Sequence, residues 1–152
     1  MATEGRIIRS DSGFHYIYAD GKVYECRMRG KTKRNQGKAY PGDMAEMTPT
    51  DDGKGILESI RPRKNLLPRP TIANGDQLLM VMTLSFPALD FNVLDRLIII
   101  ARKARLAPVI ILNKADEAEP GLLDKVVRSY DLPVLVVSAV TGQGIGELKA
   151  LL

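Results

Sequence analysis

The sequence contains one cysteine, one histidine and no tryptophan. Because Cys26 has no second cysteine to pair with, an internal disulfide is excluded. Because His15 is the single histidine, the chain cannot assemble a Cys/His zinc site from its own residues. Cys26 lies where apolar and polar residues alternate, a pattern that favours a buried structural thiol over a catalytic one.

Long apolar runs are also missing. No run approaches the roughly 18 residues that a membrane span needs, and the opening residues MATEGRIIRS lack the apolar stretch of a secretory signal. The apolar fraction of 45% and the charged fraction of 26% are those of a globular protein, and 152 residues can bury a core. We therefore expect a cytoplasmic protein without a membrane partner.

Charge is divided unevenly along the chain. Residues 1–70 hold 14 Lys and Arg against 9 Asp and Glu, whereas residues 71–152 hold 8 against 9. The net charge of +4 therefore belongs entirely to the first half. This asymmetry predicts two modules, of which the first faces a polyanion.

The first sixty residues predict a small β-barrel. Alternating strand-like segments are separated by turn residues such as Asp11-Ser12-Gly13 and Asp20-Gly21. Five short strands with one long internal loop fit an OB-fold barrel, and an SH3-like barrel fits slightly less well. The segments cover residues 5–10, 14–18, 22–28, 42–47 and 55–60.

Residues 61–70 read RPRKNLLPRP, with three prolines and four basic residues. The prolines predict a segment without a regular ladder or helix, which serves as a linker or a docking strap. Whether its basic side chains contact RNA or fix the barrel in place stays open; they are Arg61, Arg63, Lys64 and Arg69.

The second half has a different period. An apolar strand at residues 77–85 precedes helical spacing over 93–104, with Asn92 as the predicted cap and Asp95 as the third helical residue. Strands that are apolar throughout predict a parallel sheet covered on both faces. Further elements are a strand at 108–112, a helix near 120–130, a strand at 133–137 and a helix from about residue 144. The predicted domains are a barrel at 1–62, a linker at 63–76 and an α/β unit at 77–152.

Two loops of the second half follow the carboxyl ends of predicted strands, where open α/β sheets bind ligands. The first is Asn113-Lys114-Ala115-Asp116. A carboxylate at its fourth position can accept two hydrogen bonds from guanine N1–H and the exocyclic amine, a pair that adenine cannot offer. The lysine stem can lie along the base, and the asparagine can brace the neighbouring loop.

The second loop, residues 138–144, reads SAVTGQG. We expect Ser138 to brace Asp116, the N–H of Ala139 to approach guanine O6, and the glycines to permit a tight return into the last helix. A lone tetrapeptide is more typical of a helix-capping surface loop, but the order strand, loop, helix in both places favours the nucleotide interpretation. The candidate guanine site is Asn113, Lys114, Asp116, Ser138 and Ala139.

A phosphate-binding motif is missing beside these loops. The 152 residues contain neither GxxxxGK[ST], which cradles phosphates and seats magnesium, nor a strand-terminal DxxG. In the usual GTPase order these elements precede the guanine loop, where this chain has a basic barrel instead.

A barrel followed by guanine loops is the order of the RsgA (YjeQ/EngC) family, and the sequence resembles that family over essentially its whole length. The resemblance implies an OB-fold barrel followed by a partial, circularly permuted P-loop-GTPase-like parallel sheet, whose phosphate loop would begin after Leu152. The matching stretches are GRIIRSDSGFHYI, YECRMRG, the YPGD turn, IRPRKNLLPRPTIANGDQLLMV, LDRLIIIAR, NKAD and SAVTGQGIGELKALL.

The resemblance implies a GTPase that uses GTP with Mg²⁺ and acts on the small ribosomal subunit late in its maturation. Its OB-fold domain would bind ribosomal RNA. The family's phosphate loop, switch regions and zinc-binding domain have no counterpart in these residues, so no catalytic or metal-binding residue is named. We expect this chain alone not to hydrolyse GTP and to bind it weakly or not at all. The expected RNA contacts lie in one long loop and are Arg27, Arg29, Lys31, Lys33, Arg34 and Lys38.

Phe14, Tyr16 and Tyr18 share one face of a predicted strand. In a small barrel such a triplet is more typical of the core, and stacking on RNA bases is the alternative.

Two other interpretations stay open: a stand-alone RNA-binding module with a relic guanine site and no enzymatic activity, and a regulatory half-domain that completes its site with another chain. In either case the strand at 77–85 is expected to have an unpaired apolar edge, which invites self-association or disorder.

Overall fold

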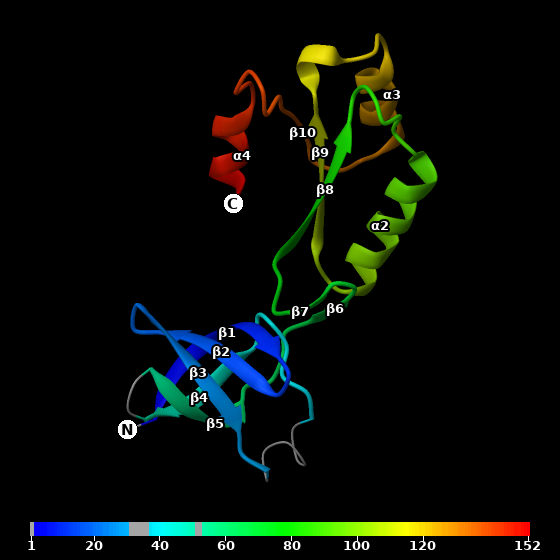
Figure 1. Cartoon of the computed structure of the whole chain (residues 1–152). Coiled ribbons are helices and arrows are strands. Elements are labelled where there is room, and N and C mark those ends of the chain that lie inside the picture. Colours follow the sequence, from blue (N-terminus) through cyan, green and yellow to red (C-terminus); the bar gives the residue numbers. More distant parts are fainter. Residues whose placement is uncertain (1, 31–36, 51–52) are drawn as a thin grey trace. The chain divides into compact units, whose positions relative to one another are not determined.

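The computed structural model describes residues 2–30, 37–50 and 53–152. The chain forms two compact units, Met1–Gly75 and Asp76–Leu152 (Figure 1). Each unit has a buried core of its own. None of the helices in the described ranges is long and apolar enough to span a membrane.

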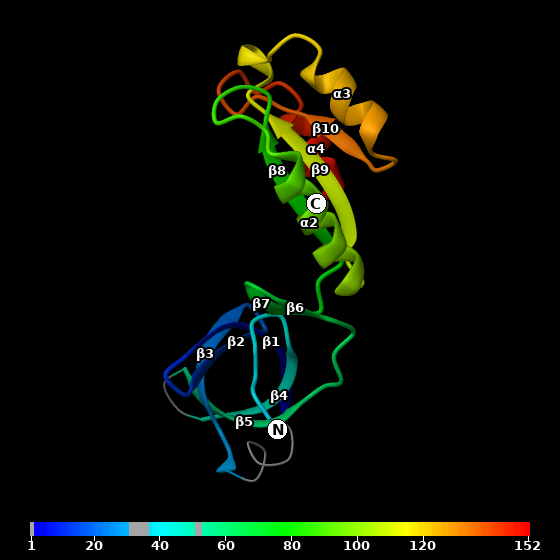
Figure 2. The same ribbon diagram turned by 90° about the vertical axis from the view of Figure 1, so that its right-hand side faces the viewer.

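The first unit is a closed five-stranded barrel in the order β1-β2-β3-β5-β4 (Figure 2). β3 and β5 pair in parallel, and the other neighbours pair antiparallel. The predicted OB-fold is therefore confirmed, with every strand close to its expected place. The strands are β1 (Thr3–Asp11), β2 (Phe14–Ala19), β3 (Lys22–Met28), β4 (Met44–Pro49) and β5 (Lys54–Ile60).

Aliphatic and sulfur-containing side chains fill the barrel. Ile7, Ile17, Met47 and Leu57 are fully buried. Cys26 is buried with them, its thiol 3.6 Å from the sulfur of Met47. Burial, with a smaller contribution from the charge of Glu25, raises the pKa of the Cys26 thiol to about 11. The prediction of a buried structural thiol is confirmed.

The aromatic residues of β2 do not belong to this core, so the core interpretation is wrong. Ile17 and Ala19 are the buried residues of β2, whereas Tyr18 is 50% exposed. Because side chains alternate between the two faces of a strand, Phe14, Tyr16 and Tyr18 all lie on the outer face. A barrel of five strands is filled here by smaller side chains, and the aromatic rings are left outside.

The proline-rich segment contains more regular structure than expected. Leu66–Pro68 (β6) and Thr71–Ala73 (β7) pair as a short antiparallel hairpin, so the prediction of no ladder over residues 61–70 is wrong at its end. Pro68 pairs with Thr71 at the last rung of this two-stranded sheet, where an edge position tolerates a residue without an N–H.

Two arginines of the same segment are bound to barrel carboxylates. Arg63 donates to both oxygens of the buried Asp43, at 2.6 Å and 2.8 Å. Arg61 lies 2.7 Å from Glu46 and 3.4 Å from Glu4. Between the two roles left open for these side chains, the contacts of Arg61 and Arg63 therefore favour anchoring the segment to the barrel.

The second unit is a parallel sheet in the order β10-β9-β8. Helices cover both of its faces, with α4 on one side and α2 and α3 on the other (Figure 1). The predicted covered parallel sheet is therefore confirmed. The elements are β8 (Gln77–Thr83), α2 (Phe91–Lys103), β9 (Ala107–Asn113), the 3-10 turn η1 (Ala115–Glu117), α3 (Leu122–Ser129), β10 (Val134–Val136) and α4 (Ile145–Leu151).

The start of α2 differs from the prediction. Its cap is Asp90, whose carboxylate accepts hydrogen bonds from the N–H groups of Asn92 and Val93. Asn92 is already helical, and the Asp95 carboxylate instead accepts from the hydroxyl of Tyr130 at 2.7 Å. The helix therefore begins one turn earlier than the apolar spacing indicated.

β8 lies at the edge of the sheet, as expected. It pairs with β9, and within the described parts of the chain no strand pairs with its other side. Val81 on this strand is 63% exposed. The unpaired apolar edge is confirmed, and the self-association expected from it stays a prediction.

Candidate functional site

The two candidate loops lie side by side because they follow neighbouring strands. β9 and β10 are parallel partners, with Leu112 opposite Val136. Asn113 is the last residue of β9, and Ser138 follows β10 after one intervening residue. The carboxyl ends of both strands therefore present their loops at one edge of the sheet.

Two hydrogen bonds join the loops. Ser138 is fully buried, and its hydroxyl donates to one carboxylate oxygen of Asp116 at 2.5 Å. The side-chain oxygen of Asn113 accepts from the N–H of Ala139 at 3.1 Å. The same Ser138 hydroxyl accepts from the N–H of Thr141 at 3.1 Å. Both expected bracing contacts, from the serine and from the asparagine, are confirmed.

Ala139 is placed differently from the role expected of it. Its N–H is directed at Asn113 rather than at open solvent, so a guanine O6 would have to share that donor or displace the asparagine oxygen. The residue itself is exposed. The role of Ala139 in base recognition stays a prediction.

The glycines of the second loop are required by its backbone. Gly142 and Gly144 have φ values of +84° and +70°, in the left-handed region that favours glycine. A Cβ on Gly144 would lie 2.1 Å from the carbonyl oxygen of Val136. The tight return into α4 therefore depends on Gly144, as the sequence predicted.

Lys114 contacts a third loop that the sequence analysis did not single out. Its ammonium donates to the carbonyl oxygen of Phe86 at 2.5 Å, and its backbone is left-handed, with φ of +63°. Phe86 follows β8 and is 84% exposed. The neighbouring Ser85 hydroxyl donates to Glu117 at 3.1 Å. Since β8 is the third strand of the sheet, its position at a strand carboxyl end was the signal that could have revealed this loop.

The three loops together form a rigid rim with one exposed carboxylate. Asp116 is exposed, and the hydrogen bond from Ser138 fixes one of its oxygens. A carboxylate held in this way can accept hydrogen bonds from two adjacent N–H donors on one edge of a planar ring. Within the described residues no group of three or more His, Cys, Asp or Glu side chains is placed to hold a metal ion.

The predicted RNA contacts are only partly described. Arg27 lies over the Phe14 ring, 4.5 Å from its centroid, and Arg29 lies 2.9 Å from Glu58. The carbonyl oxygen of Lys38 accepts from Arg63. Lys31, Lys33 and Arg34 lie outside the described residues. The RNA-binding role of this set is therefore still a prediction.

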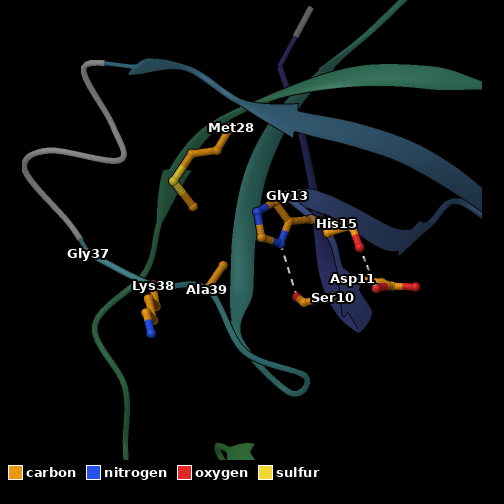
Figure 3. Close-up of a pocket in the computed structure, with 9 residues that line it drawn as sticks. Ser10, Asp11, Gly13, His15, Met28, Gly37, Lys38 and Ala39 are labelled. Atoms are coloured by element: carbon orange, nitrogen blue, oxygen red, sulfur yellow. Dashed lines mark hydrogen bonds between the residues drawn. The ribbon is translucent and has the colours of Figure 1, made fainter.

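A cavity of about 640 Å³ lies at one end of the barrel, beside the turn between β1 and β2 (Figure 3). His15 and Ser10 share a hydrogen bond of 3.0 Å on its wall, and Met28, Lys38 and Ala39 complete the lining. Residues 31–36, which directly precede Gly37 in this wall, are outside the described part of the chain, so we assign no ligand to the cavity.

Comparison with family models covers almost the whole chain. A model described as RsgA GTPase matches residues 60–152, and one described as RsgA N-terminal domain matches residues 4–57. Curated proteins called small ribosomal subunit biogenesis GTPase RsgA are similar. The one from Moorella thermoacetica is 39% identical over 151 residues, and the one from Caldanaerobacter subterraneus is 37% identical over 152. The matches cover 98% of this chain and 52% of each relative, so the chain spans about half the length of these relatives.

Two solved structures share the fold. YjeQ from Thermotoga maritima superposes with a TM-score of 0.88 at 33% identity, over 100% of this chain and 57% of that one. YloQ, described as a circularly permuted GTPase, superposes with a TM-score of 0.77 at 28% identity, over 94% of this chain and 53% of that one. The predicted relationship to circularly permuted GTPases is confirmed.

Proposed function

Because the chain belongs to the RsgA family of GTPases, we propose that it serves as a GTP-dependent factor in late maturation of the small ribosomal subunit. In this proposal the loops after β9 and β10 recognise guanine, and the barrel binds ribosomal RNA. Action on the ribosome implies a cytoplasmic location.

The observation that carries the guanine proposal is the pair of hydrogen bonds between the two loops. Ser138 fixes the Asp116 carboxylate, and Asn113 ties the second loop to the first. Guanine offers two adjacent N–H donors to such a carboxylate, whereas adenine offers an acceptor and no matching pair, so the wrong base leaves the charged oxygens unpaired.

The proposal for RNA rests on charge. The first half of the chain carries the net positive charge, and Arg27 and Arg29 are exposed on and directly after β3. Cations at the surface of a barrel bind phosphates and release counterions, which makes the binding steeply dependent on salt. A membrane plays no part in this proposal.

We further propose that the 152-residue chain by itself does not hydrolyse GTP. It contains no GxxxxGK[ST] motif, and that loop supplies most of the phosphate contacts and the magnesium seat in GTPases. Magnesium would accompany GTP through the phosphates, and we assign no residue of this chain to it. Binding through the base alone should be weak.

The experiment is a titration of the ¹⁵N-labelled chain followed by NMR. We expect GMP at millimolar concentrations to shift the amide signals of Ala139 and Thr141, and AMP to leave them in place. Asp116→Asn should abolish the response to GMP because an amide N–H₂ replaces an acceptor. The matched control is Asp124→Asn on α3, which should respond as the unaltered chain does. Equal shifts with GMP and AMP, or none with either, would overturn the guanine proposal.

A stand-alone RNA-binding module with a relic guanine site is the second candidate, and the missing phosphate motif is the observation that favours it. Salt-sensitive RNA binding together with no response to GMP would support this candidate.

A further inference from the structure

The outer face of β1, β2 and β3 is built from three cross-strand rows, each centred on an aromatic residue of β2. In every row the aromatic side chain has one neighbour on β1 and one on β3. The rows are Asp11, Phe14 and Arg27; then Arg9, Tyr16 and Glu25; then Arg6, Tyr18 and Val23.

Arginine side chains lie over two of the rings. The guanidinium carbon of Arg27 is 4.5 Å from the centroid of Phe14, and that of Arg9 is 5.1 Å from the centroid of Tyr16. Both arginines are exposed. A guanidinium held against a ring keeps its charge at the surface and has less freedom to lose when it binds a phosphate.

The carboxylates on this face already have partners. Asp11 accepts from Arg9 at 2.9 Å and from Ser12 at 3.0 Å, which lowers the pKa of the Asp11 carboxyl. Glu25 accepts from the Tyr16 hydroxyl at 3.2 Å. The charge that the face presents outward is therefore carried mainly by Arg6, Arg9 and Arg27.

The third row exposes its ring. Tyr18 is 50% exposed, and the side chains beside it, Val23 and Ile8, are 47% and 50% exposed. An aromatic ring flanked by apolar side chains, with arginines in and beyond its row, suits a flat, uncharged ring that is attached to an anionic backbone. An unpaired nucleotide has this combination of a base and a phosphate.

The spacing of the rows also favours a single strand. Alternate residues of a β-strand lie about 6.6 Å apart, whereas stacked bases repeat every ~3.4 Å. Rings at this spacing match bases that have separated from one another, and a duplex keeps its base faces covered.

We propose that the outer face of β1, β2 and β3 binds single-stranded RNA, with one unpaired base stacked on Tyr18 and phosphates held by Arg9 and Arg27. The proposal rests on the proposed function in taking RNA as the partner. It adds the form of the RNA, the strands that bind it and the residue that holds a base.

The absence of tryptophan from the sequence provides a direct test. In the Tyr18→Trp variant the new indole is the sole tryptophan, so its fluorescence reports on that position alone. We expect an oligouridine of about 12 nucleotides, within the usual site size of one OB-fold, to quench this fluorescence to saturation. Heparin, a polyanion without bases, should bind without quenching. The matched control is Val127→Trp on α3, of similar exposure at 53%, which should not be quenched.

Affinity gives an independent readout. By fluorescence anisotropy of labelled oligouridine, Tyr18→Ala should bind roughly five-fold more weakly or worse, the loss expected for one stacked base. Tyr18→Phe keeps the ring and should bind as the unaltered chain does. An unchanged affinity of Tyr18→Ala, or equal quenching by oligouridine and by a duplex, would overturn the inference.

The outcomes separate this inference from the proposed function. RNA binding without quenching at position 18, and with Tyr18→Ala unaffected, refutes the stacking face and leaves the RNA-binding role intact. A chain that binds neither oligouridine nor ribosomal RNA refutes both. A protein ligand that protects Tyr18 from quenching while RNA does not would assign the face to a protein partner and refute the inference.

Discussion

At the scale of single residues, the structure rests on polar side chains with several partners each. Asp43 accepts from Arg63 twice and from the N–H of Tyr40 at 2.8 Å, although no part of Asp43 is exposed. Ser138 is also fully buried and bridges Asp116 and Thr141. Such side chains have no water to replace a lost partner, so their substitution has measurable consequences.

Asp43→Asn should lower the free energy of unfolding of the barrel by about 3 kcal/mol, because it removes one member of a buried ion pair. The pKa of Arg63 is raised, first by its hydrogen bond to Asp43, so the guanidinium stays charged and loses its counter-ion. Urea denaturation followed by circular dichroism measures the loss. Glu4→Gln, at the exposed contact with Arg61, is the control and should cost under roughly 1 kcal/mol. Equal effects of the two substitutions would contradict the anchoring role of Arg63.

Ser138→Ala should weaken GMP binding roughly five-fold, because Asp116 loses the donor that fixes it. NMR titration of the substituted chain measures the change. In an Asp116→Ala background the same serine substitution should have little further effect, since the two residues act as one unit. Additive losses in the double variant would show that Ser138 acts by another route.

At the scale of elements, the sequence predicts type and position better than it predicts facing. Every strand of the barrel and every strand and helix of the second unit was expected near its observed place, since alternation and helical spacing report local structure directly. The facing of Tyr18 was not predictable in this way. Alternation places Phe14, Tyr16 and Tyr18 on one face, but only the volume available inside the closed barrel decides which face is buried.

Two further misses have the same local cause. The cap of α2 is Asp90, which precedes the first apolar residue of the helical pattern by one position, so spacing alone pointed to Asn92. The loop after β8 carries no charged motif, and its contact with Lys114 depends on the order of strands in the sheet. Both became visible only when the backbone was in place.

Asp90→Ala should destabilise the second unit by about 1 kcal/mol, because two N–H groups at the start of α2 lose their acceptor. Asn92→Ala should change stability by a few tenths of that, since the asparagine lies inside the helix. Thermal unfolding of the two variants compares them directly. A larger loss for Asn92→Ala would contradict the observed cap.

The exposed edge of β8 should make the chain self-associate. Val81 is 63% exposed on a strand with an unpaired side, and such edges pair with one another. We expect light scattering to give a mass that rises with concentration, and Val81→Lys to return the chain to a monomer because a charge on an edge strand opposes pairing. A monomeric, well-folded chain without any substitution would show that the edge is protected.

At the scale of the whole molecule, two units of different chemistry share one chain. The first unit carries the excess of basic residues and a ring-bearing outer face, and the second carries loops suited to guanine. The candidate guanine residues could be predicted from sequence because NKAD and SAVTGQG are contiguous. The RNA face could not, because its rows combine three strands, with Arg9 and Arg27 brought to the rings of β2 only by the register of the barrel.

The central claim, a GTPase-family chain that acts on the small ribosomal subunit, is tested most directly by sedimentation with purified ribosomal subunits over a range of salt concentrations. The account predicts that the chain pellets with small subunits and not with large ones, and that its affinity falls steeply as salt rises. Equal pelleting with both subunits, or none with the small subunit at low salt, would contradict it.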